Sequence, residues 1–226
     1  MLKRPHTLDS ISDQLLAKTS LVHAPKKAQE ELLTGTIAEL HLHPAIEALL
    51  HILNADLPSA HFLVRHMQAA PAVEGMLLHG ILHRAEGDFD NARAWIGDVE
   101  DACEGFIPKK RNEGQQLDQE VNQKMQGGKG FAGSLVAYVY GEQNPRKLID
   151  DVEHFRKKKQ SQRAKDDEES IEERIRNELA RVLEWCKGKF GTGQLADATS
   201  AWIENSEEIS AISRDMVSGD KGYRDF

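Results

Sequence analysis

The chain has 226 residues and 39% of them are hydrophobic, which is enough to bury the core of one sizeable domain or two small ones. The net charge of −8 lacks the basic excess of a general nucleic-acid surface, so we expect no nucleic-acid partner. No stretch is apolar enough to cross a bilayer and residues 1–6 lack the apolar core of a secretion signal, which predicts a cytoplasmic protein without a membrane partner.

Apolar residues recur with a helical period in nearly every long segment, so we expect an all-α fold in a single domain over residues 1–226. A one-sided apolar stripe predicts an amphipathic helix over 30–40. Two helices follow, over 44–54 and 58–70, and they form a hairpin. Prolines suit the first turn of each of these helices, and Pro71 ends the second one.

A second hairpin follows, in which helices over 72–86 and 91–102 are joined by a turn at Gly87 and Asp88. The two hairpins share one register, so residues 44–102 form a duplicated unit. Three pairs of residues carry this repeat, and the members of each pair are 32 positions apart: His51 and His83, Asp56 and Asp88, and Ala60 and Ala92.

Residues 104–130 are polar and rich in Lys, Gln, Asn and Gly, so we expect an insertion that forms a loop with at most a short helix. Its glycine cluster, 127–130, lacks the Walker arrangement of a phosphate-binding loop, which favours a flexible turn. The apolar segment 131–140 suits a buried helix or a short strand, since periodicity does not separate the two at this length.

The remainder of the chain is predicted to consist of helices. Asn144 is a suitable cap for the first of them, and Ser170 with Glu173 matches the capping box that begins a second, which ends at Gly191. The charges of both signs between 156 and 169 favour a solvated surface. These C-terminal helices, all within 131–217, are expected over 145–159, 170–190 and 206–217, before a frayed tail over 218–226.

The duplicated unit resembles a tetratricopeptide-type hairpin. In each copy a small residue precedes an alanine by twelve positions, Ala48 before Ala60 and Gly80 before Ala92, which lets the two helices approach closely. The period of 32 departs from the usual value of about 34. Two units are too few for an open superhelix, so flanking helices are expected to complete tetratricopeptide-like tandem hairpins into a compact bundle.

Residues 79–95 carry a second resemblance. The pattern His-Arg-x-Glu-Gly-Asp-x-x-Asn-Ala is similar to a signature segment of uncharacterised, mainly fungal helical proteins with bacterial relatives. This resemblance implies no activity.

One helix in the duplicated unit combines an apolar surface with a narrow polar stripe. Between Met76 and Glu86 most positions are apolar or small, so this helix is expected to be largely buried. Its stripe consists of His79, His83 and Glu86, and the equivalent stripe of the first hairpin consists of Glu47, His51 and Asn54.

Buried polar stripes must be satisfied, because an unpaired buried polar group costs about 1 to 3 kcal/mol. Three solutions are open: a hydrogen-bonded seam, a metal site, and a metal-free pocket. In a metal site His79 and His83, one turn apart, would present imidazole nitrogens to a divalent first-row ion such as zinc. Glu86, with His51 and Glu47 from the other stripe, would supply further ligands if the two stripes face each other.

Three neighbouring residues complete the candidates for a pocket or turn. Asp88 and Asn91 suit the turn and cap before a helix, and Arg84 is an isolated charge on the apolar helix. Cys103 and Cys186 lack any spacing partner, so we expect packed thiols instead of a disulfide or a zinc knuckle.

These patterns identify no reaction and no catalytic residue. They favour a small cytoplasmic helical binding or interaction protein, whose concave surface would take a protein or peptide partner. The alternative is a metal-dependent enzyme or metal-binding protein centred on the histidine and glutamate stripe.

Overall fold

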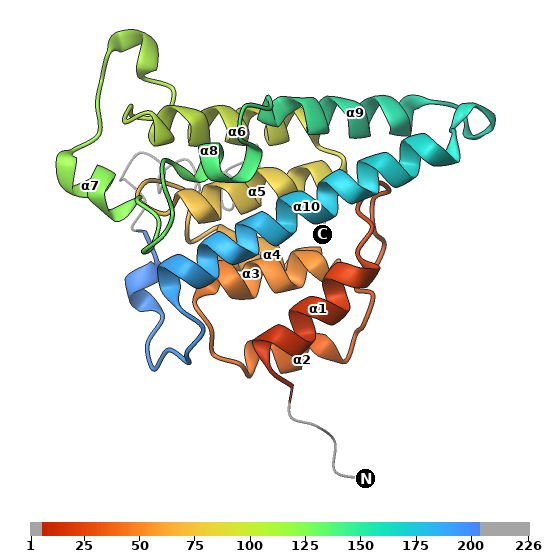
Figure 1. Ribbon diagram of the computed structural model, residues 1–226, viewed down its shortest axis with the longest axis horizontal. Coiled ribbons are helices and arrows are strands. Elements are labelled where there is room, and N and C mark those ends of the chain that lie inside the picture. The colour runs from red at the N-terminus through yellow and green to blue at the C-terminus, as the bar shows by residue number, and fades with distance from the viewer. Residues whose placement is uncertain (1–5, 204–226) are drawn as a thin grey trace, which may run out of the picture.

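The computed structural model describes residues 6–203, and the regular elements of these residues are helical (Figure 1). The all-α prediction is confirmed for this part of the chain. The predicted helix over 206–217 and the tail over 218–226 lie outside the described residues. The α-helices are α1 (Leu8–Lys18), α2 (Leu33–Ala38), α3 (Pro44–Leu53), α4 (Leu57–Val64), α5 (Val73–Glu86), α6 (Phe89–Cys103), α7 (Gln119–Lys124), α8 (Leu135–Tyr140), α9 (Pro145–Lys157) and α10 (Lys165–Phe190), and 3-10 helices cover Arg111–Glu113, Gln160–Gln162 and Thr199–Ala201.

Two successive hairpins, α3 with α4 and α5 with α6, have the same turn. The amide of Asp56 donates to the carbonyl of His51 at 2.9 Å, and the amide of Asp88 donates to the carbonyl of His83 at the same distance. Each aspartate side chain then caps the following helix, where it accepts from a backbone amide three residues on. The 32-residue offset in the sequence thus corresponds to equivalent contacts in the structure.

Small side chains let the helices of each hairpin approach closely. Ala48, Ala60, Gly80 and Ala92 are all buried. A Cβ atom added to Gly80 would lie 3.2 Å from the Cβ of Trp95, so a larger residue would push α5 and α6 apart.

The long helix α10 packs against α1, α3, α8 and α9, while α6 lies beside α9 (Figure 1). The buried face of α10 includes Ile175, Leu179, Val182 and Trp185. These side chains belong to one core cluster with residues of the hairpin helices. These contacts join the duplicated hairpins to the C-terminal helices in one compact helical arrangement.

Two predicted helix starts differ from the structure. Residues 30–32 precede α2 instead of belonging to it, because the side chain of Asn54 bonds both the amide and the carbonyl of Glu30. The predicted capping box at Ser170 and Glu173 is wrong, since α10 already begins at Lys165 with three acidic residues in its first turn. Acidic side chains there are favoured by the helix dipole.

Two further helices were left open or missed in the sequence. Within the segment 131–140, residues 135–140 form α8, so the helix alternative is correct for this part and no strand forms. Helix α1 is capped by Thr7 and Ser10, whose side chains each accept from the other residue's amide. Serine in place of the usual Glu or Gln at the third helical position conceals this capping box.

The helix predicted over 58–70 ends at Val64, and the next residues turn so that Met67 packs against Gly75.

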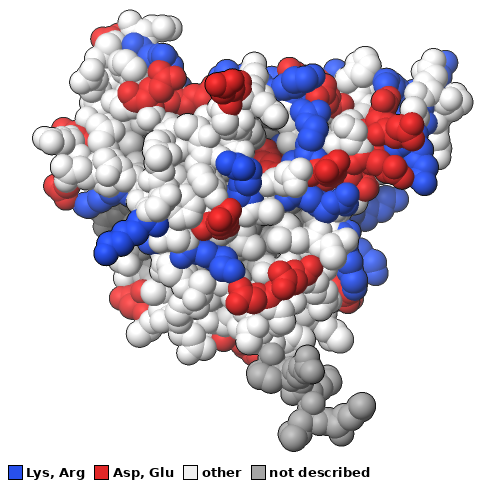
Figure 2. Space-filling model, viewed as in Figure 1, with Lys and Arg blue, Asp and Glu red and all other residues white. Residues whose placement is uncertain are grey.

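Charged side chains of both signs alternate over α9 and the first half of α10 (Figure 2). Lys158 pairs with Asp167 at 3.1 Å, and Arg174 pairs with Asp151 at 2.6 Å. The charge run is therefore a solvated, internally paired surface, as its sequence indicated. Within residues 6–203, no helix combines the length and the hydropathy needed to span a membrane.

The glycine cluster of the insertion is packed, in contrast to the predicted flexible turn. A Cβ atom on Gly128 would lie 2.0 Å from the carbonyl oxygen of Gly188 on α10, and one on Gly127 would meet the Cβ of Phe131 and the ring of Trp185. These glycines let the insertion approach the backbone of α10. Otherwise the insertion is mostly loop, with two short helices, at Arg111–Glu113 and in α7, where at most one was predicted.

Replacement of Gly128 with alanine is expected to lower the free energy of unfolding by about 1 to 3 kcal/mol, because the new methyl group meets backbone atoms that a rotamer change does not move. Urea denaturation followed by circular dichroism measures this loss. Gly193→Ala is the matched control, since a Cβ there has no neighbour within 4 Å. Equal stability of the two variants would contradict the packing described for the cluster.

Candidate metal centre

Three imidazoles meet between the two hairpins. His61, His79 and His83 each place one ring nitrogen within 4.8 Å of the other two, and within residues 6–203 no other trio of metal-ligating side chains does so. The ring centroids are 4.9 to 5.3 Å apart. The cluster combines two residues of the predicted stripe with a third histidine from the preceding hairpin.

The packing of α4 against α5 creates this cluster. His79 and His83 lie one turn apart on α5, and His61 comes from the middle of α4, which Asp56 caps. The indole of Trp95 on α6 stacks on His79 with centroids 4.3 Å apart. The ring of His79 is therefore fixed by neighbours on both sides, and only 4% of this residue is exposed.

The carboxylate of Glu86 lies between two of the rings. Its Oε1 is 3.3 Å from Nδ1 of His61, and its Oε2 is 3.3 Å from Nδ1 of His83. Burial alone would raise the pKa of Glu86, but the contacts with His61 and His83 outweigh it and lower the pKa to about 2. Glu86 is consequently a carboxylate at neutral pH.

The other nitrogen of His61 faces His79. The two Nε2 atoms are 3.2 Å apart, so one of them carries a proton and the other accepts it. Burial, with the nearby His83, His61 and Arg65, lowers the pKa of His79 to about 3. At neutral pH His79 is the uncharged imidazole, which is the form that binds metal ions.

The cluster is not a closed hydrogen-bond network. Nδ1 of His79 and Nδ1 of His83 are buried without a hydrogen-bond partner among the described residues, although Glu86 and Asp88 lie 3.3 and 3.8 Å from the latter. Both carboxylates are close enough for attraction, but the contact with Glu86 misses hydrogen-bond geometry and Asp88 is too distant for a hydrogen bond. A seam that satisfies its own members would leave neither nitrogen unpartnered.

The predicted residues His51 and Glu47 lie elsewhere. Nδ1 of His51 is 3.2 Å from Oδ2 of Asp56, and Nε2 of His51 is 3.9 Å from Oε1 of Glu47. The same Asp56 oxygen accepts from the hydroxyl of Thr34 at 2.8 Å. The structure therefore brings together His79, His83 and Glu86, but places the first stripe in a separate buried cluster.

The sequence does not point to His61 when only the first helices of the two hairpins are compared. In a row of hairpins, the second helix of one unit packs against the first helix of the next, so α4 faces α5. His61 directly follows Ala60, which the repeat pairs with Ala92, so this adjacency of helices could have identified His61.

The remaining candidates have structural partners. Asp88 caps α6 and also accepts from the side chain of Asn91 at 2.6 Å. Arg84 points away from the histidines into a buried ion pair, in which its guanidinium donates to both oxygens of Glu178. The hydroxyl of Tyr140 donates to the same carboxylate at 2.7 Å.

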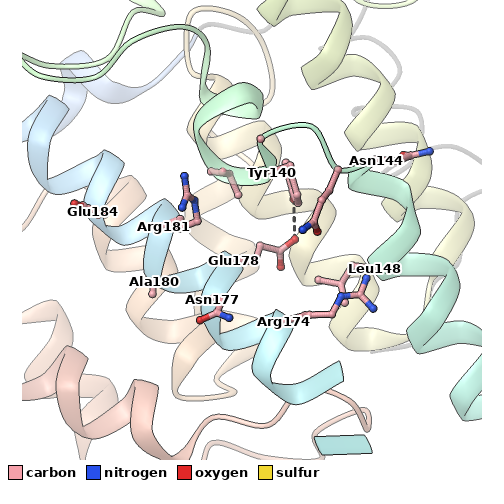
Figure 3. Close-up of a pocket in the computed structure, with 12 residues that line it drawn as sticks. Tyr140, Asn144, Leu148, Arg174, Asn177, Glu178, Ala180, Arg181 and Glu184 are labelled. Atoms are coloured by element: carbon pink, nitrogen blue, oxygen red, sulfur yellow. Dashed lines mark hydrogen bonds between the residues drawn. The ribbon is translucent and has the colours of Figure 1, made fainter. Parts of the chain in front are cut away.

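Glu178 also forms part of a separate pocket of about 450 Å³ between α8, α9 and α10 (Figure 3). Tyr140 and Asn144 lie on one side of Glu178, and Arg174 and Arg181 flank it along α10. Both arginines have partners, Asp151 for the first and the carbonyl of Tyr138 for the second. The pocket is open and mixed in polarity.

A scan of the chain against protein-family models found no match, and searches of curated proteins and of solved structures found none either.

Proposed function

We propose that this protein binds a divalent first-row metal ion, with zinc the best fit, through His61, His79 and His83. The observation that carries this proposal is the convergence of three imidazoles at the contact of α4 and α5. Imidazole nitrogen is a preferred zinc ligand, and the uncharged His79 supplies it with no net loss of a proton once any proton on its Nε2 shifts to Nδ1.

The geometry supports a tetrahedral site. Zinc–nitrogen bonds of about 2.0 to 2.1 Å place neighbouring tetrahedral ligands about 3.3 Å apart. The Nε2 atoms of His61 and His79 are already 3.2 Å apart. One nitrogen of His83 lies within 4.8 Å of the other two, so the His83 ring would have to move to reach the same ion.

Glu86 is not a metal ligand in this proposal but a partner of two of the ligating histidines. It contacts the Nδ1 atoms of His61 and His83, and the two nitrogens of an imidazole point away from each other. A carboxylate 3.3 Å from Nδ1 attracts the imidazole proton to that side, although the contact with His83 lacks hydrogen-bond geometry, and the Nε2 lone pair is then left for the metal. Glu86 therefore orients two ligands, and the fourth coordination position stays free for water.

A zinc ion with three protein ligands and one water is the arrangement of catalytic sites. Such an ion acts as a Lewis acid and lowers the pKa of its water to about 7. The partial exposure of the side chains of His61 and His83, at 20% and 13%, gives that position contact with solvent. The proposal thus includes metal-dependent activation of water or of a polar ligand.

Zinc titration of untagged protein, by calorimetry and by metal analysis after desalting, tests the site. We expect one zinc per chain, and affinity that falls by more than about 100-fold in His79→Gln and by about 10- to 100-fold in Glu86→Gln. His51→Gln is the control, because this buried histidine lies outside the cluster. Absence of stoichiometric zinc, or an equal loss in His51→Gln, would refute the assignment.

A second candidate function is the binding of a protein or peptide partner. The open pocket of about 450 Å³ between α8, α9 and α10 favours it. The equivalent turns of the two hairpins support the tetratricopeptide-like interpretation, and partner binding is common to such hairpins. The likeness of residues 79–95 to the fungal proteins and a cytoplasmic location belong to the same proposal.

A further inference from the structure

We propose that the pocket between α8, α9 and α10 binds a small saccharide, a neutral ligand that carries neighbouring hydroxyl groups. The pocket has a volume of about 450 Å³, which is in the range that small-molecule ligands occupy. The inference does not depend on a bound metal ion. It goes beyond both candidate functions, because it gives the pocket a small ligand of its own.

The charged groups at the floor of the pocket are already paired within the protein. The guanidinium of Arg84 donates to both carboxylate oxygens of Glu178. The guanidinium of Arg174 lies 2.6 Å from a carboxylate oxygen of Asp151. A ligand with a net charge would have to displace one of these partners.

A second group of opposite charges lies around Tyr138, at the end of the pocket next to α8. Nε of Arg181 donates to the carbonyl of Tyr138 at 2.8 Å, and Glu184 accepts from the hydroxyl of the same tyrosine. Arg181 and Glu184 are three positions apart on α10, so their side chains are neighbours on the helix surface. The charges around the pocket therefore balance, which favours a neutral ligand.

The free hydrogen-bonding groups of the pocket are carboxamides. Gln143 and Asn144 line it from the segment that leads into α9, and Asn177 lines it from α10. Among residues 6–203, the side chains of Gln143 and Asn177 have no hydrogen-bond partner, while the carbonyl oxygen of Asn144 accepts from the amide of Arg146. A carboxamide holds a donor and an acceptor side by side. Neighbouring sugar hydroxyls match this pair, because each hydroxyl both donates and accepts.

The floor of the pocket supplies one further acceptor and an apolar surface (Figure 3). Oε1 of Glu178 accepts from Arg84 and from the hydroxyl of Tyr140, whereas Oε2 accepts only from Arg84. A carboxylate has about four lone-pair sites, so Oε2 retains capacity for one ligand hydroxyl. Val139 and Leu148 also line the pocket and supply apolar contacts for the C–H groups of a sugar ring.

NMR titration of the isotope-labelled chain with glucose, galactose, mannose, N-acetylglucosamine and maltose tests the inference. We expect at least one sugar to shift the backbone amide signals of residues 140–144 and 174–181 in a saturable way. Gln143→Ala and Asn177→Ala should each lower its affinity about three- to tenfold, the effect of losing one or two neutral hydrogen bonds. Gln160→Ala, which removes an exposed carboxamide outside the pocket, should bind as wild type does.

The readouts separate binding from folding. Gln143 and Asn177 are exposed, so their alanine variants should melt at the wild-type temperature. The affinity should also be nearly independent of salt concentration, because no ligand charge is involved.

Four outcomes would overturn the inference. They are the absence of saturable shifts at the pocket with every sugar, a stronger response to citrate or phosphate, a response to a capped uncharged peptide alone, and equal sugar affinity in wild type and both pocket variants. A response to the peptide alone would support the second candidate function. None of these results bears on the zinc site, whose own titration decides it.

Discussion

Replacement of Arg84 with methionine should lower the free energy of unfolding by about 3 to 5 kcal/mol. Arg84 and Glu178 are 2% and 3% exposed, and the guanidinium holds both carboxylate oxygens. Without Arg84 the carboxylate of Glu178 would be a buried charge with only the hydroxyl of Tyr140 as partner. The cost therefore comes from the charge that is left behind, more than from the bond that is lost.

A double-mutant cycle distinguishes this cause from simple loss of packing. Glu178→Gln alone leaves the charge of Arg84 unpaired, while its amide oxygen still accepts from Tyr140. The double variant Arg84→Met with Glu178→Gln buries no charge, so it should be more stable than either single variant. Urea denaturation of the four proteins measures the cycle. Additive losses would contradict a dominant role for unpaired charge.

The hairpins were predictable because their signals are local. Pro44 at the first turn of α3, and Gly87 with a positive φ of 101° after α5, mark helix ends by their own backbone constraints. Repetition at a fixed offset adds a second, independent signal. The turn contacts of Asp56 and Asp88 then need only the same residue at the same place in each unit.

Features that depend on distant residues were not predictable in this way. Helix α2 starts later than predicted because the side chain of Asn54 forms hydrogen bonds with the backbone of Glu30. No residue near position 30 in the sequence indicates these bonds. The partner of Arg84 lies 94 positions away on α10. The packing of Gly128 against Gly188 likewise requires knowledge of which segments meet.

The candidate site depends both on local sequence signals and on contacts between distant parts of the chain. Helical spacing predicted that His79, His83 and Glu86 share a stripe, and the structure places them together. The choice between His51 and His61 as the third imidazole depends on which helix faces α5, which is a property of tertiary packing. A periodic pattern gives the face of one helix but not the neighbour that covers it.

Acid should destabilise the metal-free protein between about pH 7 and pH 5, because one buried and one half-buried histidine, His79 and His43, resist protonation. Burial, with the neighbouring imidazoles and Arg65, lowers the pKa of His79 to about 3, and burial with Lys189 lowers the pKa of His43 to about 4. In the unfolded chain both groups titrate near their ordinary value of about 6.5. Below that pH the unfolded chain binds protons that the folded chain does not.

The sign and window of the effect follow from this difference. Above about pH 7 both states hold neutral histidine and stability is flat, while at pH 5 each histidine removes about 2 kcal/mol. Glu86 acts in another window: its pKa is lowered to about 2, so its contribution is complete above about pH 4.5 and is lost only below that. It does not obscure the loss caused by the histidines.

Urea denaturation at several pH values, in the presence of a chelator, measures how steeply the free energy of unfolding falls as the pH is lowered. His79→Gln should lose stability with pH about half as steeply as wild type, since the contribution of His43 remains. Zinc in place of the chelator should steepen the dependence, because protons and the metal compete for the same imidazole nitrogens. A flat profile down to pH 5, or an unchanged slope in His79→Gln, would show that His79 does not stay neutral in the folded protein.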